Sequence, residues 1–171
     1  AAVILLMLSL GLGSVMLASP TARATIVRWV TEWYETHIVF RYAGEDAPGE
    51  MPRYELGELP EGFVENLESQ FVGTGMTAHF YENEKGDVIL FEYIYMQQGS
   101  LSGVNTENAY VISVIVNDCE GLLVIPKEED SNSMLMWLDP EHDLQFTLDA
   151  PLGQEDILHM AESVHLVETM K

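Results

Sequence analysis

The chain has 171 residues, 47% of them hydrophobic, and its 28 acidic against 7 basic residues give a formal net charge of -21. This charge excludes nucleic acid and anionic lipid surfaces as partners of the acidic part, because both bind proteins through Lys and Arg that neutralise phosphate. The single cysteine, Cys119, excludes an intrachain disulfide. The length beyond the N-terminal segments is enough for one hydrophobic core, so we expect one folded domain.

Residues 1–18 form an uncharged apolar run. A helix needs about 20 such residues to cross a membrane, since each residue rises about 1.5 Å. The run therefore predicts a transmembrane anchor, and because no basic flank precedes it we expect it to begin within a longer membrane segment. A cleaved signal peptide with a site near Ala22-Arg23-Ala24 is one alternative. A buried helix of a soluble core is another, although its two glycines would weaken it.

Residues 19–36 are predicted to form a juxtamembrane amphipathic helix. Ser19 and Pro20 suit a helix start, and apolar residues then recur at three- and four-residue spacing. This face either packs on the core or lies at the membrane interface, where tryptophans and basic residues anchor to headgroups. The residues that we expect to couple the domain to the membrane are Trp29, Trp33, Arg23 and Arg28.

Residues 37–171 are expected to form the extracytoplasmic domain. After an extended segment over 37–42 and a linker over 43–52, the apolar pattern has a period of two, which is typical of strands. The strands are predicted over 54–56, 77–81, 88–96, 109–116, 122–125, 134–138 and 144–148. Short connections favour antiparallel pairing, with Gly121 at positive φ in the turn over 117–121.

A closing helix is predicted from Gln154, because its apolar residues share one face: Ile157, Leu158, Ala161 and Val164. The fold class is therefore α+β, with an antiparallel meander sheet of about six to eight strands. We expect the juxtamembrane N-terminal helix before this sheet and the C-terminal helix packed on it.

Several motifs together resemble a bacterial domain family of unknown function. They are Trp29-Val30-Thr31-Glu32-Trp33-Tyr34, the stretch 54–63 with Leu59-Pro60-Glu61-Gly62-Phe63, Ile89-Leu90-Phe91, and Trp137 before the closing helix sequence 157–164. The family follows a single transmembrane helix in anti-sigma-factor-like and sporulation-related membrane proteins. The resemblance implies a non-enzymatic, extracytoplasmic domain behind an intracellular segment, and it supplies no catalytic residues. No such segment is in this sequence, so the resemblance assigns no sigma-factor contact to these residues.

The inventory of reactive side chains favours no catalytic, metal or cofactor site. Cys119 is expected in a hairpin turn without a basic neighbour to lower its pKa. Asp139, Glu141 and Asp143 alternate in one loop but lack the glycine and distal Glu of a calcium loop. Four histidines are dispersed without a zinc-binding spacing: His79, His142, His159 and His165. Paired carboxylates for glycoside hydrolysis remain open, because their separation in space is the criterion.

The aromatic residues of the predicted sheet are the candidate ligand-binding set: Phe91, Tyr93, Tyr95, Tyr110 and Trp137. Their first interpretation is cross-strand packing beneath the closing helix. Their second is the floor of a site for an apolar or peptide ligand.

The sequence thus predicts a non-catalytic, membrane-anchored extracytoplasmic sensor or interaction domain. One form of this prediction is the outer part of an anti-sigma-factor-like regulator. The expected partners are the membrane, through residues 1–18, and a protein, peptide or envelope component, but no nucleic acid. One alternative function is an anchored or secreted hydrolase that uses carboxylates, which two facing acids in a pocket would favour. Another is a static envelope scaffold, which a large exposed apolar patch would favour.

Overall fold

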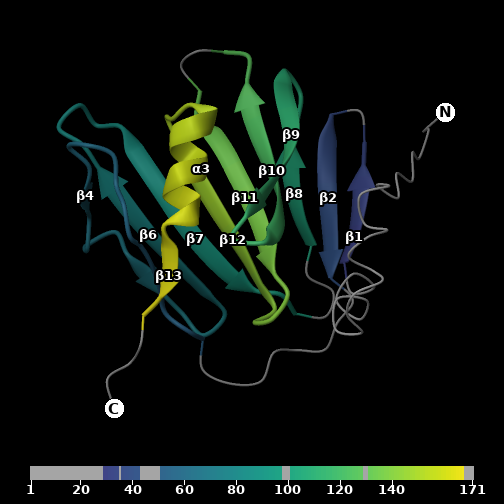
Figure 1. Cartoon of the computed structure of the whole chain (residues 1–171), viewed down its shortest axis with the longest axis horizontal. Helices are drawn as coiled ribbons and strands as arrows, with labels where there is room; N and C mark the ends of the chain where they lie inside the picture. Colours follow the sequence, from purple (N-terminus) through teal and green to yellow (C-terminus); the bar gives the residue numbers. More distant parts are fainter. Residues whose placement is uncertain (1–28, 35, 43–50, 98–100, 129–130, 168–171) are drawn as a thin grey trace. The chain divides into compact units, whose positions relative to one another are not determined.

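The computed structural model describes residues 29–34, 36–42, 51–97, 101–128 and 131–167. The chain divides into two compact units (Figure 1). One unit contains residues 1–47 and 96–107, and the other contains residues 48–95 and 108–171.

The first unit contains a three-stranded antiparallel sheet in the order β1-β2-β8. Its strands are β1 (Trp29–Trp33), β2 (His37–Tyr42) and β8 (Leu101–Asn105). The extended segment expected over 37–42 is confirmed as β2. The helix expected over 19–36 is wrong at Trp29–Trp33, which pair in register with Ile38–Tyr42. Residues 19–28 of that expected helix lie outside the described residues, and β1 and β2 pair across the expected boundary at residue 36.

The second unit is built on an eight-stranded antiparallel sheet. The order is β4-β6-β7-β12-β11-β10-β9, with β5 also paired to β6. The strands on the β6 side are β4 (Val64–Glu65), β5 (Phe71–Val72), β6 (Met76–Glu82) and β7 (Val88–Tyr95). The strands on the β9 side are β9 (Ala109–Val116), β10 (Cys119–Pro126), β11 (Ser133–Asp139) and β12 (Leu144–Ala150). This sheet confirms the predicted α+β class and the antiparallel connections.

One face of this sheet is covered by α3 (Gln154–Glu162), which crosses it in Figure 1. Ile157, Met160 and Ala161 are the buried residues of the helix, and they join the sheet's aromatic core. The helix ends before Val164, which was expected on its apolar face. Instead β13 (Val164–Leu166) pairs with β3 (Tyr54–Leu56) in a separate two-stranded sheet.

The strand sequences alternate because successive side chains point to opposite faces of the sheet. In β7, Ile89, Phe91 and Tyr93 are buried, whereas Leu90 and Glu92 between them are partly exposed. In register, Tyr93 lies opposite Phe146 and Phe91 opposite Leu148. In β12 all of Leu144–Leu148 are buried, on both faces of the sheet. The core therefore lies between α3 and one face of the sheet, and we call this the covered face.

The β9–β10 turn differs from its prediction. Asn117 and Asp118 take the positive φ values, 47° and 65°, and form a two-residue turn of the kind that Asn and Asp tolerate. Cys119, expected in the turn, is the first residue of β10. Gly121, expected at positive φ, lies inside β10 opposite Trp137. A Cβ on Gly121 would come within 2.8 Å of the Met136 carbonyl oxygen, so close strand approach explains this glycine.

Within the described ranges, no helix has the length and apolar character to cross a membrane. The anchor expected over residues 1–18 lies outside the described residues.

Candidate functional site

Three residues of the predicted aromatic set lie together in the core. Phe91, Tyr93 and Trp137 are at most 3% exposed. Each has its ring centroid within 6.2 Å of that of Phe146, and the Trp137 ring stacks on Phe146 at 5.1 Å. Their placement matches the packing interpretation, because side chains that are this closely packed leave no floor for a ligand.

The other predicted residues lie apart from this cluster. Tyr95 ends β7 and is partly buried, and this burial raises its pKa. Tyr110 on β9 is 60% exposed, and the Lys127 ammonium lies 5.2 Å from its ring centroid. Of the four residues expected to couple to the membrane, Trp29 and Trp33 are the ends of β1. Arg23 and Arg28 lie outside the described residues.

A Tyr-Asp-His group joins β3 to the β11–β12 turn. His142 Nδ1 lies 2.7 Å from Asp139 Oδ2, and the Tyr54 hydroxyl lies 3.3 Å from the same nitrogen. The backbone N–H groups of Glu141 and His142 donate to the other Asp139 oxygen. Burial, followed by the nearby Asp139 charge, raises the pKa of Tyr54, which therefore stays protonated and can donate. Through these contacts, Asp139 stabilises the β11–β12 turn.

Cys119 and His79 are also held in structural positions. Burial, with the Asp139 and Asp118 carboxylates as further causes, raises the pKa of Cys119 to about 11, which disfavours the thiolate that a nucleophile needs. His79 is 2% exposed, its Nδ1 lies 2.8 Å from Glu65 Oε1, and its ring stacks beside Phe91. The described residues contain no group of three or more His, Cys, Asp or Glu that could hold a metal ion.

A cavity of about 320 Å³ lies between the β3–β4 connection and α3. The connection is tied to the end of the helix, since Gly57 N–H donates to the Ser163 carbonyl and Glu58 N–H to Ser163 Oγ, both at 3.1 Å. Its turn closes with a hydrogen bond from Phe63 N–H to Pro60 O, and Gly62 takes a φ of 87°. The lining residues are Glu58, Leu59, Pro60, Glu61, Leu152, Asp156, His159 and Met160.

The lining combines an apolar part with carboxylates. Glu58, Glu61 and Asp156 are all exposed. His159 Nδ1 lies 3.2 Å from Glu58 Oε2, and this contact joins the helix to the connection. An alkyl chain that ends in a cation fits such a lining, because its stem can cover apolar atoms while its charged head reaches a carboxylate.

The described elements therefore form an α+β domain in which α3 packs on an antiparallel sheet. The profile of a family described as a domain of unknown function, DUF4367, matches residues 53–164. The match covers about two thirds of the chain, which therefore belongs to this family. No curated protein and no solved structure matches the chain.

The matched range contains the whole cavity lining and the eight-stranded sheet, but neither β1 nor β2. The family assignment confirms the resemblance to a domain of unknown function. The sequence pattern does not predict the cavity, because the two walls of the cavity are about a hundred residues apart in the chain. The signal that could have identified it is the Leu59-Pro60-Glu61-Gly62-Phe63 motif, whose first three residues line it.

Proposed function

We propose that this chain is a non-catalytic interaction domain that binds a lysine- or arginine-bearing peptide segment in the cavity between the β3–β4 connection and α3. The observation that supports this proposal is the lining, where Glu58, Glu61 and Asp156 surround an apolar part. A basic side chain would gain charge-assisted hydrogen bonds from the carboxylates and apolar contact for its stem.

The charge of the domain supports a basic ligand. Residues 53–164 contain 22 acidic and 3 basic residues. Such an excess of one sign raises the local concentration of oppositely charged ligands and speeds their association, and salt screens both effects. An acidic segment would be repelled by the same field.

Membrane attachment is the second part of the proposal. The uncharged run over residues 1–18 would anchor the chain in a membrane, with the acidic domain outside the cytoplasm. The likeness to domains of anti-sigma-factor-like proteins supports a role as the outer part of a regulator. Because Trp29 and Trp33 begin and end β1, coupling to the membrane would pass through the β1–β2 pair.

A carboxylate hydrolase is the second candidate, because the cavity contains more than one acid. Glu58 is 63% exposed on its side chain, and Glu61 and Asp156 are also exposed. A catalytic acid usually owes its raised pKa to a desolvated site, which such exposure does not provide. Exposed carboxylates favour binding over hydrolysis.

A static scaffold is the third candidate, and it draws on exposed apolar side chains at the sheet edge. Val64, Leu67, Phe71 and Val72 are each at least 50% exposed. Exposed apolar patches are typical of interaction surfaces. A scaffold would not distinguish basic from neutral peptides in the cavity.

Calorimetric titration of the full chain in detergent with a short lysine peptide, and with its norleucine analogue, tests the proposal. We expect the lysine peptide to bind at least about tenfold more tightly, with the difference reduced in 0.5 M salt. The double variant Glu61→Gln, Asp156→Asn should lose this preference. The matched control Glu84→Gln, Asp87→Asn, at the β6–β7 turn, should keep it. Equal binding of both peptides by the unmodified chain would overturn the proposal, and turnover of a glycoside substrate that these variants abolish would favour the hydrolase.

A further inference from the structure

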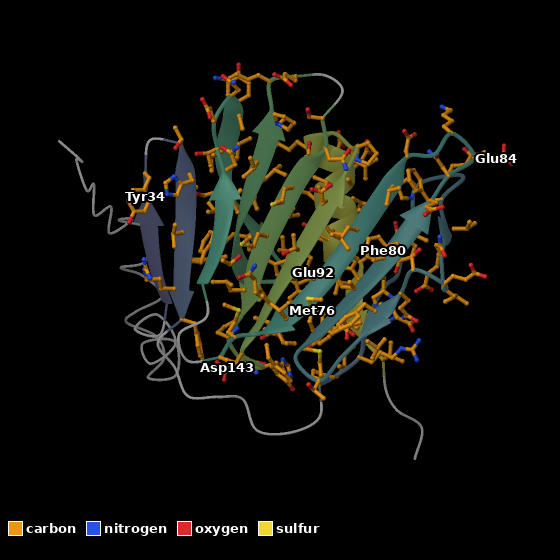
Figure 2. All side chains as sticks on the ribbon, turned by 180° about the vertical axis from the view of Figure 1, so that it is seen from behind. Tyr34, Met76, Phe80, Glu84, Glu92 and Asp143 are labelled. Atoms are coloured by element: carbon orange, nitrogen blue, oxygen red, sulfur yellow. The ribbon has the colours of Figure 1, made fainter. Side chains whose placement is uncertain are left out.

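The face of the eight-stranded sheet opposite α3, which we call the open face, carries partly exposed apolar side chains on β6 and β7. On the neighbouring strand β12 it carries Gln145, Thr147 and Asp149. The register places Phe80 beside Leu90 and Met76 beside Ile94, on the side opposite Phe91 and Tyr93. Met136 pairs with Leu122 on the same side. Figure 2 looks onto this face, with Met76, Phe80 and Glu92 labelled. Its Ala78, Met136 and Thr147 are buried, whereas Met76, Phe80 and Leu90 are partly exposed.

Glu92 is the charged group at the centre of the open face. It lies in β7 between Ala78 of β6 and Thr147 of β12, all on the same side of the sheet. The side chain is partly buried, and this burial raises its pKa. Within the described part of the chain it makes no hydrogen bond or ion pair. A half-desolvated carboxylate in this setting is costly unless a cation pairs with it.

Within the described residues of this unit, no lysine or arginine is paired with Glu92. The basic residues within 53–164 are Arg53, Lys85 and Lys127. Arg53 precedes β3 and is paired with Glu55, Lys85 is in the β6–β7 turn, and Lys127 follows β10 beside the Tyr110 ring. A molecule that covers the face and places a cation opposite Glu92 would supply this counter-charge.

We propose that the open face docks an amphipathic segment of a partner protein, which covers the apolar side chains and places a lysine or arginine against Glu92. The partly exposed methionines of the face, Met76 and Met134, suit such docking because their unbranched side chains adapt to different shapes. This second surface goes beyond the proposed function, since the cavity is formed by α3 on the other side of the sheet.

Charge complementarity selects this occupant over two others. A second copy of the chain would bring another net charge of -21 and its own Glu92 to the face. An uncharged apolar occupant would bury the Glu92 carboxylate without a partner, at a cost that a cation removes.

Three synthetic helical peptides test the proposal on the full chain in detergent. They share one apolar face and differ only at its centre, which carries lysine, norleucine or glutamate. Fluorescence anisotropy should show at least about tenfold tighter binding of the lysine peptide than of the glutamate peptide. Glu92→Lys should reverse this order, and Glu92→Gln should remove the advantage of lysine over norleucine.

Two further variants separate this surface from the cavity. Glu61→Gln with Asp156→Asn should leave the lysine preference of the helical peptides unchanged, because those residues line the cavity. Leu90→Asp, which adds a second carboxylate to the open face, should weaken binding of the norleucine peptide. If Glu92→Lys does not fold, Glu92→Gln alone tests whether Glu92 causes the preference for the lysine peptide. A lysine preference that survives Glu92→Gln, or that the cavity variant abolishes, would overturn the proposal.

Discussion

Both faces of the eight-stranded sheet carry apolar side chains, but α3 packs on the covered face alone. On the covered face, α3 and β3 close over rings such as Tyr93 and Phe146, and the Tyr93 hydroxyl accepts a hydrogen bond from the Tyr54 backbone N–H. On the open face, Leu90 and Ile94 flank Glu92, which makes no hydrogen bond or ion pair within the described residues. A strand can therefore present apolar side chains on both of its faces. One face packs in the chain's own core, and we propose that the other contacts another molecule.

Replacing a phenylalanine on each face should give the largest contrast. Phe146 is 2% exposed and its ring contacts Tyr54, Phe91 and Trp137, so Phe146→Ala should cost about 3–5 kcal/mol of unfolding free energy. Phe80→Ala on the open face should cost about 1–2 kcal/mol, because its side chain already contacts water. Urea unfolding at pH 7 measures both, and equal losses would mean that the open face is packed as tightly as the covered one.

Gly121 tests how tightly the covered face is packed at β10. In Gly121→Ala the added Cβ would lie 2.8 Å from the Met136 carbonyl oxygen and 3.0 Å from the Trp137 Cβ. The strands must move apart, so we expect a loss of about 1–3 kcal/mol in the same urea assay. The control Gly103→Ala meets only the Ile38 carbonyl oxygen, at 3.8 Å, and should be neutral or stabilising. A neutral Gly121→Ala would show that β10 and β11 can separate freely.

Glu92 gives a smaller effect that depends on pH. Burial raises the pKa of Glu92 in the folded state above the ordinary value of a glutamate, so the folded chain holds this proton more tightly than the unfolded chain. Stability from this group is present below the unfolded pKa and is lost as the pH rises through the folded pKa. Glu92→Gln should therefore raise the urea midpoint at pH 7 but not at pH 4. The exposed Glu120→Gln should change neither, and a lower midpoint for Glu92→Gln at pH 7 would contradict this account.

The alkylation rate of the Cys119 thiol reports on the covered face without a change in the stability of the folded chain. Burial raises the pKa of Cys119 to about 11 from the ordinary cysteine value of 9.0, which means about 100-fold less thiolate at pH 8 in the folded chain. Alkylation by iodoacetamide at pH 8 should be slower by about that factor than in 8 M urea. Equal rates would show that the end of β10 opens readily in the folded protein.

The hydrophobic pattern of the sequence predicts those strands, and the helix, that have one strongly buried face. The predictions over 88–96, 109–116 and 144–148 are confirmed because the pleat imposes a period of two wherever one side meets a core. Trp29 and Trp33 were assigned to a helix because a spacing of four residues satisfies both a helical and a strand period. The short strands β4, β8 and β13 were missed, since a few residues carry too little pattern and tertiary pairing decides their conformation.

The candidate site was less accessible to sequence reasoning than the fold. Phe91, Tyr93 and Trp137 were identified as a cluster, but only their burial distinguishes a packed core from a binding surface. The cavity depends on Glu58 and Asp156 meeting across the fold, and no local period connects residues so far apart. Glu92 stands out in the sequence as an acid among apolar neighbours, but its cross-strand neighbours Ala78 and Thr147 follow only from the register of three strands.

The pairing of β3 with β13 has a mechanical consequence. The two strands lie side by side with Tyr54 opposite Leu166, and Val167 N–H donates to the Arg53 carbonyl, so the chain enters and leaves the domain at one point. Tension applied at residues 53 and 167 would load these hydrogen bonds one after another, as in unzipping, rather than all at once. The β3–β13 pair would separate first while the eight-stranded sheet stays intact. Force applied at one end of the domain would therefore act next to the Tyr54 ring.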